Sequence, residues 1–257
     1  MTPGSDTICT RRRMAPDARR EAILDAAQAL FMARGSDAVT IADVLAAAGI
    51  SKGGFYHHFT AKDDLLTGIV ARMTGEVLAV AEAARVQTSG NALERLNAFL
   101  ARSVRWKAEN AAETRFLAEV MLRPGNDILF QRIMAATADA VVPVLEDMIA
   151  DGVREGVFDA ADPRVTAEIF IGMSQGRQAI LAEAIATAAA GGIDVATERL
   201  DARMRAESEA CDRLLGLPAA SVRLSNPADS RRVLAGLAVS GDEKPGRADD
   251  PSKETHD

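Results

Sequence analysis

The stretch from Thr40 to Leu66, TIADVLAAAGISKGGFYHHFTAKDDLL, constrains the fold more than any other part of the sequence. It opens with a capping-box pattern, in which Thr40 is the predicted N-cap and Asp43 is its partner three residues later. Gly49 ends the helix that follows, and Ser51 is a suitable N-cap for a second, short helix. The stretch therefore predicts a helix, a tight turn and a short second helix.

Predicted helices flank this stretch on both sides. Apolar residues recur at helical spacing from Arg19 to Arg34, and Gly35 ends that run. After the short second helix, Thr60 and Asp63 repeat the capping-box pattern ahead of another apolar stripe. This alternation predicts a small helical domain near the start of the chain.

The rest of the chain predicts longer helices. Ala, Leu, Glu and Arg favour helices and are abundant, whereas β-branched and aromatic residues at period two are scarce. The fold class expected is therefore all-α. The longer helices are expected at residues 92–109, 112–122, 127–154 and 162–189, with a last one ending at 215.

Composition divides the chain into four regions. Residues 1–15 form an expected flexible basic arm, in which Arg11–Arg13 are either a solvated tail or a groove-binding arm and Met14 is an alternative start. Residues 16–66 form the helix-turn-helix domain, and residues 67–216 form a second helical domain. The tail, residues 217–257, is expected to be largely disordered, although Asn226 and Pro227 could open one more short helix.

Charge and composition exclude several classes of protein. The net charge of -7 argues against indiscriminate coating of nucleic acid, so any DNA binding must come from a local patch. The sequence has no run of 18 apolar residues, so no membrane span is expected. Cys9 and Cys211 do not form a disulfide framework, which favours a cytoplasmic protein. No catalytic motif and no metal-spaced His/Cys cluster occurs, so neither an enzyme nor a cofactor or metal is expected.

The second helix of the motif, near residues 52–58, carries the chemistry. Gly53 and Gly54 weaken it, which makes sense if a ligand such as DNA approaches the backbone closely. Phe55 and Phe59, four residues apart, are expected to face the core. Lys52, Tyr56, His57 and Lys62 are then expected to offer hydrogen-bond donors along one surface, with His58 used in packing rather than in a metal site.

The segment SKGGFYHHFTAKDDLL, preceded by TIADVLAAAGI, resembles the DNA-binding signature of the TetR/AcrR family of repressors. The resemblance covers residues 19–69 and is looser beyond them. It implies an N-terminal three-helix helix-turn-helix DNA-binding domain and a C-terminal helical bundle for ligand binding and dimerisation. The DNA-contacting residues that it implies are Thr40, Ser51, Lys52, Gly53, Gly54, Tyr56, His57 and Lys62. Gly54 departs from the pattern, because the family often has Thr, Ser or Ala there.

The function expected is a ligand-responsive regulator that binds a palindromic operator in double-stranded DNA. One small reading surface binds weakly, so a homodimer is expected, with half-sites about 34–36 Å apart or a multiple of that. A small-molecule effector would release the DNA, and activation rather than repression stays open. An enzyme or a purely structural helical adaptor is the alternative, and DNA affinity that falls steeply with salt would argue against both.

Candidates for the effector pocket and the dimer interface come from the second domain. The pocket candidates are large or polar side chains, each with plain core packing as its alternative: Phe99, Arg102, Trp106, Phe116, Met121, Phe170, Met173 and Arg177. The dimer candidates are apolar or small residues, each with a place in the protomer's own core as an equal alternative: Val144, Leu145, Met148, Gly172 and Gly176.

Overall fold

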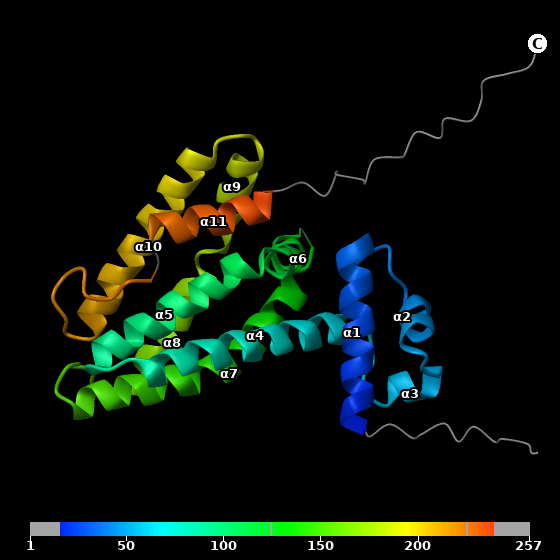
Figure 1. Ribbon diagram of the computed structural model, residues 1–257, viewed down its shortest axis with the longest axis horizontal. Coiled ribbons are helices and arrows are strands. Elements are labelled where there is room, and N and C mark those ends of the chain that lie inside the picture. Colours follow the sequence, from blue (N-terminus) through cyan, green and yellow to red (C-terminus); the bar gives the residue numbers. More distant parts are fainter. Residues whose placement is uncertain (1–15, 124, 225, 239–257) are drawn as a thin grey trace, which may run out of the picture. The chain divides into compact units, whose positions relative to one another are not determined.

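The computed structural model describes residues 16–123, 125–224 and 226–238, which form eleven helices and no strand (Figure 1). The expected all-α class is confirmed. The helices are α1 Pro16–Arg34, α2 Ile41–Ala48, α3 Lys52–Tyr56, α4 Lys62–Gln87, α5 Ala92–Glu109, α6 Ala111–Leu122, α7 Asp127–Arg154, α8 Pro163–Gln175, α9 Gln178–Ala189, α10 Ile193–Leu214 and α11 Pro227–Ala238.

Local start and stop signals set most of these boundaries. Asn91 caps α5 with a capping box to Glu94, and Asp162 caps α8 ahead of a proline at its first position. The single helix expected over residues 162–189 is wrong, because the chain breaks between α8 and α9. Gly176 ends α8, donating its N–H to the Gly172 carbonyl, and Arg177 starts α9 without a side-chain cap.

The described residues form two compact units. The first contains residues up to Glu76 together with Glu119–Ala140, and the second contains Val77–Ala118 together with the residues from Val141 onward. In the first unit α1 packs against α2, and Arg72 of α4 binds back to α1 through Asp25 at 2.6 Å. Its largest fully buried side chains include Phe31, Phe55 and Leu65. This core holds the short helix α3 in place.

In the second unit, α10 packs against both α9 and α11, and α11 also contacts α5 (Figure 1). Their shared core is built from Ala184, Leu200, Met204 and Leu234. Within the expected tail the structure describes residues 217–224 and 226–238, and the apolar side of α11 is buried through Leu234 and Leu237. The residues after Ala238, like those of the predicted basic arm, lie outside the described part of the chain.

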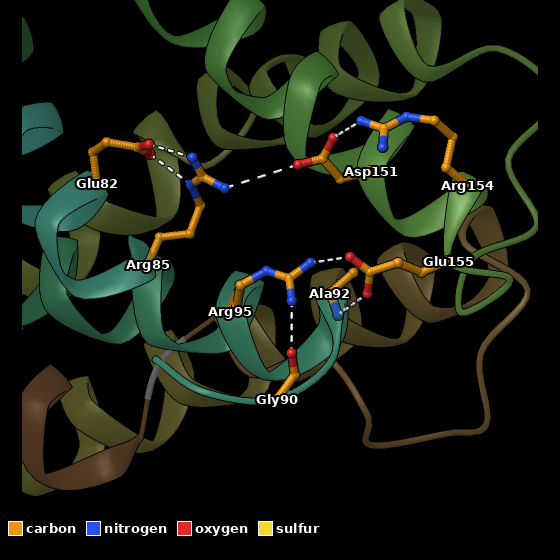
Figure 2. Close-up of polar contacts among 8 residues, drawn as sticks. All are labelled: Glu82, Arg85, Gly90, Ala92, Arg95, Asp151, Arg154 and Glu155. Carbon is orange, nitrogen blue, oxygen red and sulfur yellow. Dashed lines mark hydrogen bonds and ion pairs between the residues drawn. The ribbon is translucent and has the colours of Figure 1, made fainter. Parts of the chain in front are cut away.

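A polar cluster joins the end of α4, the start of α5 and the end of α7 within the second unit. Figure 2 shows Arg85 between Glu82 and Asp151, at 2.7 Å and 3.9 Å. Arg95 donates to the Gly90 carbonyl at 2.6 Å and pairs with Glu155, whose other oxygen accepts the Ala92 N–H at 2.9 Å. Each arginine is neutralised by a carboxylate, and these ion pairs hold the end of α4, the start of α5 and the end of α7 together.

One helix among the described residues, α7, is long and apolar enough to span a membrane by length and composition alone. Leu129 and Ile133 on it are buried in the first unit, and Leu145 and Ile149 are buried in the second. Core helices pass the same test of length and composition. Because 22% of its most apolar window is buried, packing accounts for part of the apolar character of α7, and its length and composition alone are weak evidence for a membrane span.

Candidate nucleic-acid interface

The N-terminus of α2 is built by the predicted capping box. Thr40 Oγ1 accepts the Asp43 N–H at 3.2 Å, and Asp43 Oδ2 accepts the Thr40 N–H at 2.8 Å and its hydroxyl at 2.6 Å. The hydrogen bonds from the Thr40 side chain and backbone lower the pKa of Asp43. Thr40 is exposed while it performs this role, so the N-terminus of α2 lies at the surface.

The turn between α2 and α3 has the geometry that its glycine allows. Gly49 adopts φ +63° and ψ +34°, a left-handed conformation that an L side chain disfavours. Its N–H and that of Ile50 return to carbonyls of α2, with the Ile50 N–H 3.1 Å from the Leu45 oxygen. Ser51 then caps α3 by accepting the Gly54 N–H at 3.3 Å. The helix-turn-helix expected from the sequence is confirmed.

Helix α3 separates an apolar anchor from an exposed polar side. Phe55 and Phe59 are buried with their ring centroids 5.8 Å apart, as expected. Tyr56 is 48% exposed and meets Phe55 edge-on, and Lys52 and His57 are exposed. The anchor fixes the helix, so the polar side faces solvent without any rearrangement.

The two glycines of α3 have different surroundings. A Cβ added at Gly53 would meet nothing within 4 Å, so the space over its backbone is open to a binding partner. A Cβ at Gly54 would lie 3.0 Å from Ile50 Cγ2 and 3.4 Å from Ser51 Oγ. Close packing therefore favours glycine at position 54, in addition to the DNA approach that the sequence predicts for both glycines.

The two histidines also differ. His57 is exposed, whereas His58 Nε2 is buried with no hydrogen-bond partner among the described residues. Desolvation lowers the pKa of His58 most, followed by the positive charges of His57, Arg19 and Arg20. The lowered pKa favours the neutral form of His58, and the burial of its Nε2 supports the packing role expected from the sequence. No group of three or more His, Cys, Asp or Glu that could hold a metal occurs in the described ranges.

Lys62, at the start of α4, is partly withdrawn from solvent. Its Nζ lies 5.8 Å from the centroid of the Phe31 ring, a cation–π contact with α1. The expected capping box at Thr60 and Asp63 is wrong by one residue, because Asp64 accepts the Thr60 N–H at 2.8 Å and the Ala61 N–H at 3.2 Å. The turn between α3 and α4 is thus braced by Asp64.

Two arginines from the second segment of the first unit reach the helix-turn-helix region. Arg132 of α7 donates to Asp64 at 2.7 Å, and Arg123 pairs with Asp37 in the loop before α2. The sequence analysis missed both residues, because their partners lie far away along the chain. The adjacent acids Asp63 and Asp64 were the only local signal, and they do not reveal which of the two binds.

The pocket candidates belong to both compact units. Phe99, Trp106, Phe116 and Phe170 are buried in the second unit, and Met173 is half-buried there, whereas Met121 belongs to the first unit. Arg102 pairs with Glu109 at 2.9 Å, and Arg177 pairs with Glu207 of α10. Cys211, also on α10, is buried and reduced, and desolvation raises its pKa to about 12.

The dimer candidates divide by exposure. Leu145 and Met148 are buried in the protomer, which favours the alternative of a core role for them, and Val144 is half-buried. Gly172 and Gly176 on α8 are exposed, and a Cβ at Gly172 would meet nothing within 4 Å. Their helix also exposes Val165 and Ile169, with 47% and 41% of their surface accessible, which the sequence analysis did not single out.

Comparison with known proteins agrees with this architecture. Residues 23–69 match the family of bacterial regulatory proteins of the tetR family, and residues 108–178 match a tetracyclin repressor-like C-terminal domain. The repressor KstR2 of Rhodococcus jostii is 42% identical over 62 residues, which are 23% of this chain and 30% of KstR2. The regulator YfiR of Bacillus subtilis is 24% identical over 162 residues, 62% of this chain and 78% of YfiR.

Solved structures show the same fold. RolR in complex with its ligand resorcinol aligns with a TM-score of 0.55 and 18% identity, covering 86% of this chain and 94% of RolR. A TetR-family regulator from Syntrophomonas wolfei aligns with a TM-score of 0.53 and 17% identity, covering 79% of this chain and all of that one. The chain spans only 30–40% of the length of the KstR2 relatives that it matches in Rhodococcus jostii and Mycobacterium tuberculosis.

Proposed function

The chain belongs to the TetR family of bacterial regulatory proteins, and from this premise we propose that it is a transcriptional repressor that binds a palindromic operator. The family and these relatives are transcriptional regulators rather than enzymes. One observation carries the proposal: α3 exposes Lys52, Tyr56 and His57 beside the open backbone of Gly53, on a helix anchored by Phe55.

This arrangement fits the chemistry of a DNA backbone. A helix N-terminus offers unpaired N–H groups to phosphates, and Lys52 adds a positive charge at that end of α3. Tyr56 lies one turn further along and offers its hydroxyl on the same side. Thr40, Ser51, Gly54 and Lys62 complete the proposed contact set. We expect Lys62 to contribute less than Lys52, because its Nζ is held over Phe31.

We propose that the protein acts as a homodimer through α8 and α10. Val165, Ile169 and Gly172 form an exposed apolar stripe on α8, and an exposed Val195 lies on α10, which contacts α8. A second copy can bury this stripe, with Gly172 allowing close approach of a helix. Two reading surfaces would then meet two half-sites of a palindrome.

A small-molecule effector that lowers DNA affinity completes the proposal, with the cytoplasm as the place of action. RolR, a structural neighbour, has been solved with the ligand resorcinol. In this chain α4, α6 and α7 each contribute residues to both units. A change in the second unit could thus be carried into the first along continuous helices.

The test is a fluorescence-anisotropy titration of the full chain with DNA from its own upstream region, at two salt concentrations. We expect saturable binding that resists competitor DNA and weakens as salt rises. Tyr56→Ala and Lys52→Gln should each weaken binding about tenfold, and Lys52→Gln should also reduce the salt slope by about one.

Arg105→Gln is the matched control, because it removes an exposed positive charge from α5 in the second unit. It should leave DNA affinity unchanged. Equal binding by wild type, Tyr56→Ala and Lys52→Gln would contradict the contact assignment. A failure of wild type to select any fragment from the genomic DNA of its source would contradict the regulator proposal itself.

A further inference from the structure

Position 54 of the helix-turn-helix departs from the family pattern, because the chain has glycine where the family often has Thr, Ser or Ala. A side chain at this position could contact DNA, and glycine removes that contact. The space beside Gly54 is nevertheless occupied from another helix. A Cβ at Gly54 would lie 4.0 Å from Cδ of Arg19, on α1, and Figure 1 draws α3 beside the start of α1. The aliphatic stem of Arg19 therefore lies beside the backbone of α3.

Glycine at position 54 leaves room for this stem. An alanine Cβ would make an ordinary van der Waals contact with Arg19 at 4.0 Å, although it would be tight against Ile50 at 3.0 Å. A serine or threonine side chain extends at least one atom further and would compete with Arg19 for the same space. Gly54 thus allows a positive charge from α1 to stand beside α3.

Arg20, the next residue of α1, has different neighbours. Its Cζ lies 5.4 Å from the centroid of the Phe59 ring, and its Nη1 pairs with Glu21 at 3.1 Å. Its Nη2 lies 3.5 Å from the position of a Cβ added at Gly68 on α4. Arg20 therefore packs against Phe59 and α4, whereas Arg19 extends beside the backbone of α3.

Positive charge prevails around Arg19. Desolvation lowers the pKa of the nearby His58 most, and the charges of His57 and Arg19 come next. Arg20 acts in the same direction, and Asp17 opposes them most weakly. The chain as a whole has a net charge of -7, so this local excess is contrary to its composition. Like charges held close together repel one another, and a phosphate of DNA would offset that repulsion.

We propose that Arg19 binds a backbone phosphate of duplex DNA, in place of the contact that a side chain at position 54 would make. The inference rests on the proposed function and extends its contact set from the helix-turn-helix to α1. Arg19 is half-exposed, so it can reach a partner in solvent. A guanidinium offers parallel N–H donors and a permanent charge to a phosphate, a stronger contact than a neutral hydroxyl makes. Such a contact adds affinity and fixes register without reading a base.

The salt dependence of DNA affinity tests the contact. The full chain is titrated by fluorescence anisotropy with a random-sequence duplex, between about 50 and 200 mM salt. Arg19→Gln should weaken binding about tenfold and reduce the salt slope by about one, with thermal unfolding unchanged. Arg19→Lys keeps the charge and should keep most of the slope. Arg20→Gln is the matched control, because it removes one positive charge from the same helix and should leave the slope unchanged.

A double-mutant cycle tests the role of Gly54. Gly54→Ser places a side chain in the space beside Arg19, so adding Arg19→Gln should then weaken DNA binding by less than about twofold. Gly54→Ala is the reference background, because it crowds Ile50 in the same way but only touches Arg19. The effect of Arg19→Gln should stay about tenfold there. Equal effects of Arg19→Gln in the serine and alanine backgrounds would overturn the exchange between Arg19 and position 54.

The outcomes separate this inference from the regulator function. If wild type selects genomic fragments but Arg19→Gln keeps the wild-type affinity and salt slope, the Arg19 contact is wrong and the regulator proposal stands. An equal loss of slope in Arg20→Gln would also overturn the contact, because any charge on α1 would then act alike. If wild type selects no fragment but Arg19→Gln lowers the slope on random duplex, the contact stands and the regulator proposal is wrong. A wild type that binds no duplex at any salt concentration would overturn both.

Discussion

The helix-turn-helix region and the buried Glu207 with its two arginines, Arg177 and Arg203, place charged groups by opposite means. In the first, Lys52, Tyr56 and His57 follow one another along a short helix whose caps are set by residues within a few positions. In the second, Arg177 and Glu207 meet across 30 residues of chain. Function that rests on local signals is visible in a sequence, whereas function that rests on distant partners appears only once the helices pack.

The largest expected effect tests how much the second unit depends on that distant pairing. Glu207→Ala leaves Arg177 and Arg203 without their carboxylate, and we expect the free energy of unfolding to fall by about 2–4 kcal/mol. Urea unfolding followed by circular dichroism measures it. Glu209→Ala is the control, because its exposed carboxylate lies 3.7 Å from Arg213, and such pairs contribute about 0–1 kcal/mol. Equal losses of unfolding free energy in Glu207→Ala and Glu209→Ala would contradict the dependence of the second unit on the Glu207 pairing.

A second change probes packing near the end of α7. A Cβ at Gly152 would lie 2.0 Å from Phe158 Cδ2, so Gly152→Ala must displace the buried Phe158 ring. We expect a loss of about 1–3 kcal/mol in thermal unfolding. Gly75→Ala on α4 meets nothing within 4 Å and should instead be neutral or stabilising by up to about 1 kcal/mol. A neutral Gly152→Ala would show that the ring relaxes freely.

The stability of the first unit should depend on pH through Asp64 but not through its neighbour Asp63. Hydrogen bonds from Thr60 and Arg132 lower the pKa of Asp64 strongly. A carboxylate with a lowered folded-state pKa stabilises above its unfolded pKa of about 4, and the stabilisation disappears as pH falls below that value. Asp64→Asn should therefore cost about 1 kcal/mol at pH 7 and flatten the acid limb of the stability curve. Asp63→Asn serves as the control, and an identical acid limb in both variants would contradict the role of Asp64.

The smallest stability effects separate the two glycines of α3. Gly53→Ala meets open space, so folding should change by less than about 1 kcal/mol while DNA affinity falls, because the added methyl group blocks close approach. Gly54→Ala must push Ile50 aside, so it should lose stability as well as affinity. Anisotropy and thermal unfolding of both variants test this. If Gly53→Ala bound DNA as tightly as wild type, the proposed close approach of DNA to the backbone at Gly53 would be contradicted.

Most element boundaries were predictable because their signals are local. The Thr40 capping box, the left-handed Gly49 and the Asp162-Pro163 start all act within one turn of helix. The break at Gly176 was missed because glycine and arginine are both compatible with a continuing helix at that point. The short helix that Asn226 and Pro227 could open is α11, but its burial was not predictable, since that depends on α9 and α10.

The sequence by itself determined the all-α class, the helix-turn-helix and the exposed donors of α3, because caps, turns and apolar spacing act over a few residues. Only the tertiary structure decided that Asp64 rather than Asp63 binds Arg132, that Leu145 and Met148 are buried in the protomer, and that Arg177 faces Glu207. A side chain's partner depends on which helices are packed beside it. That packing is a property of the whole core, and no single stretch of the sequence contains it.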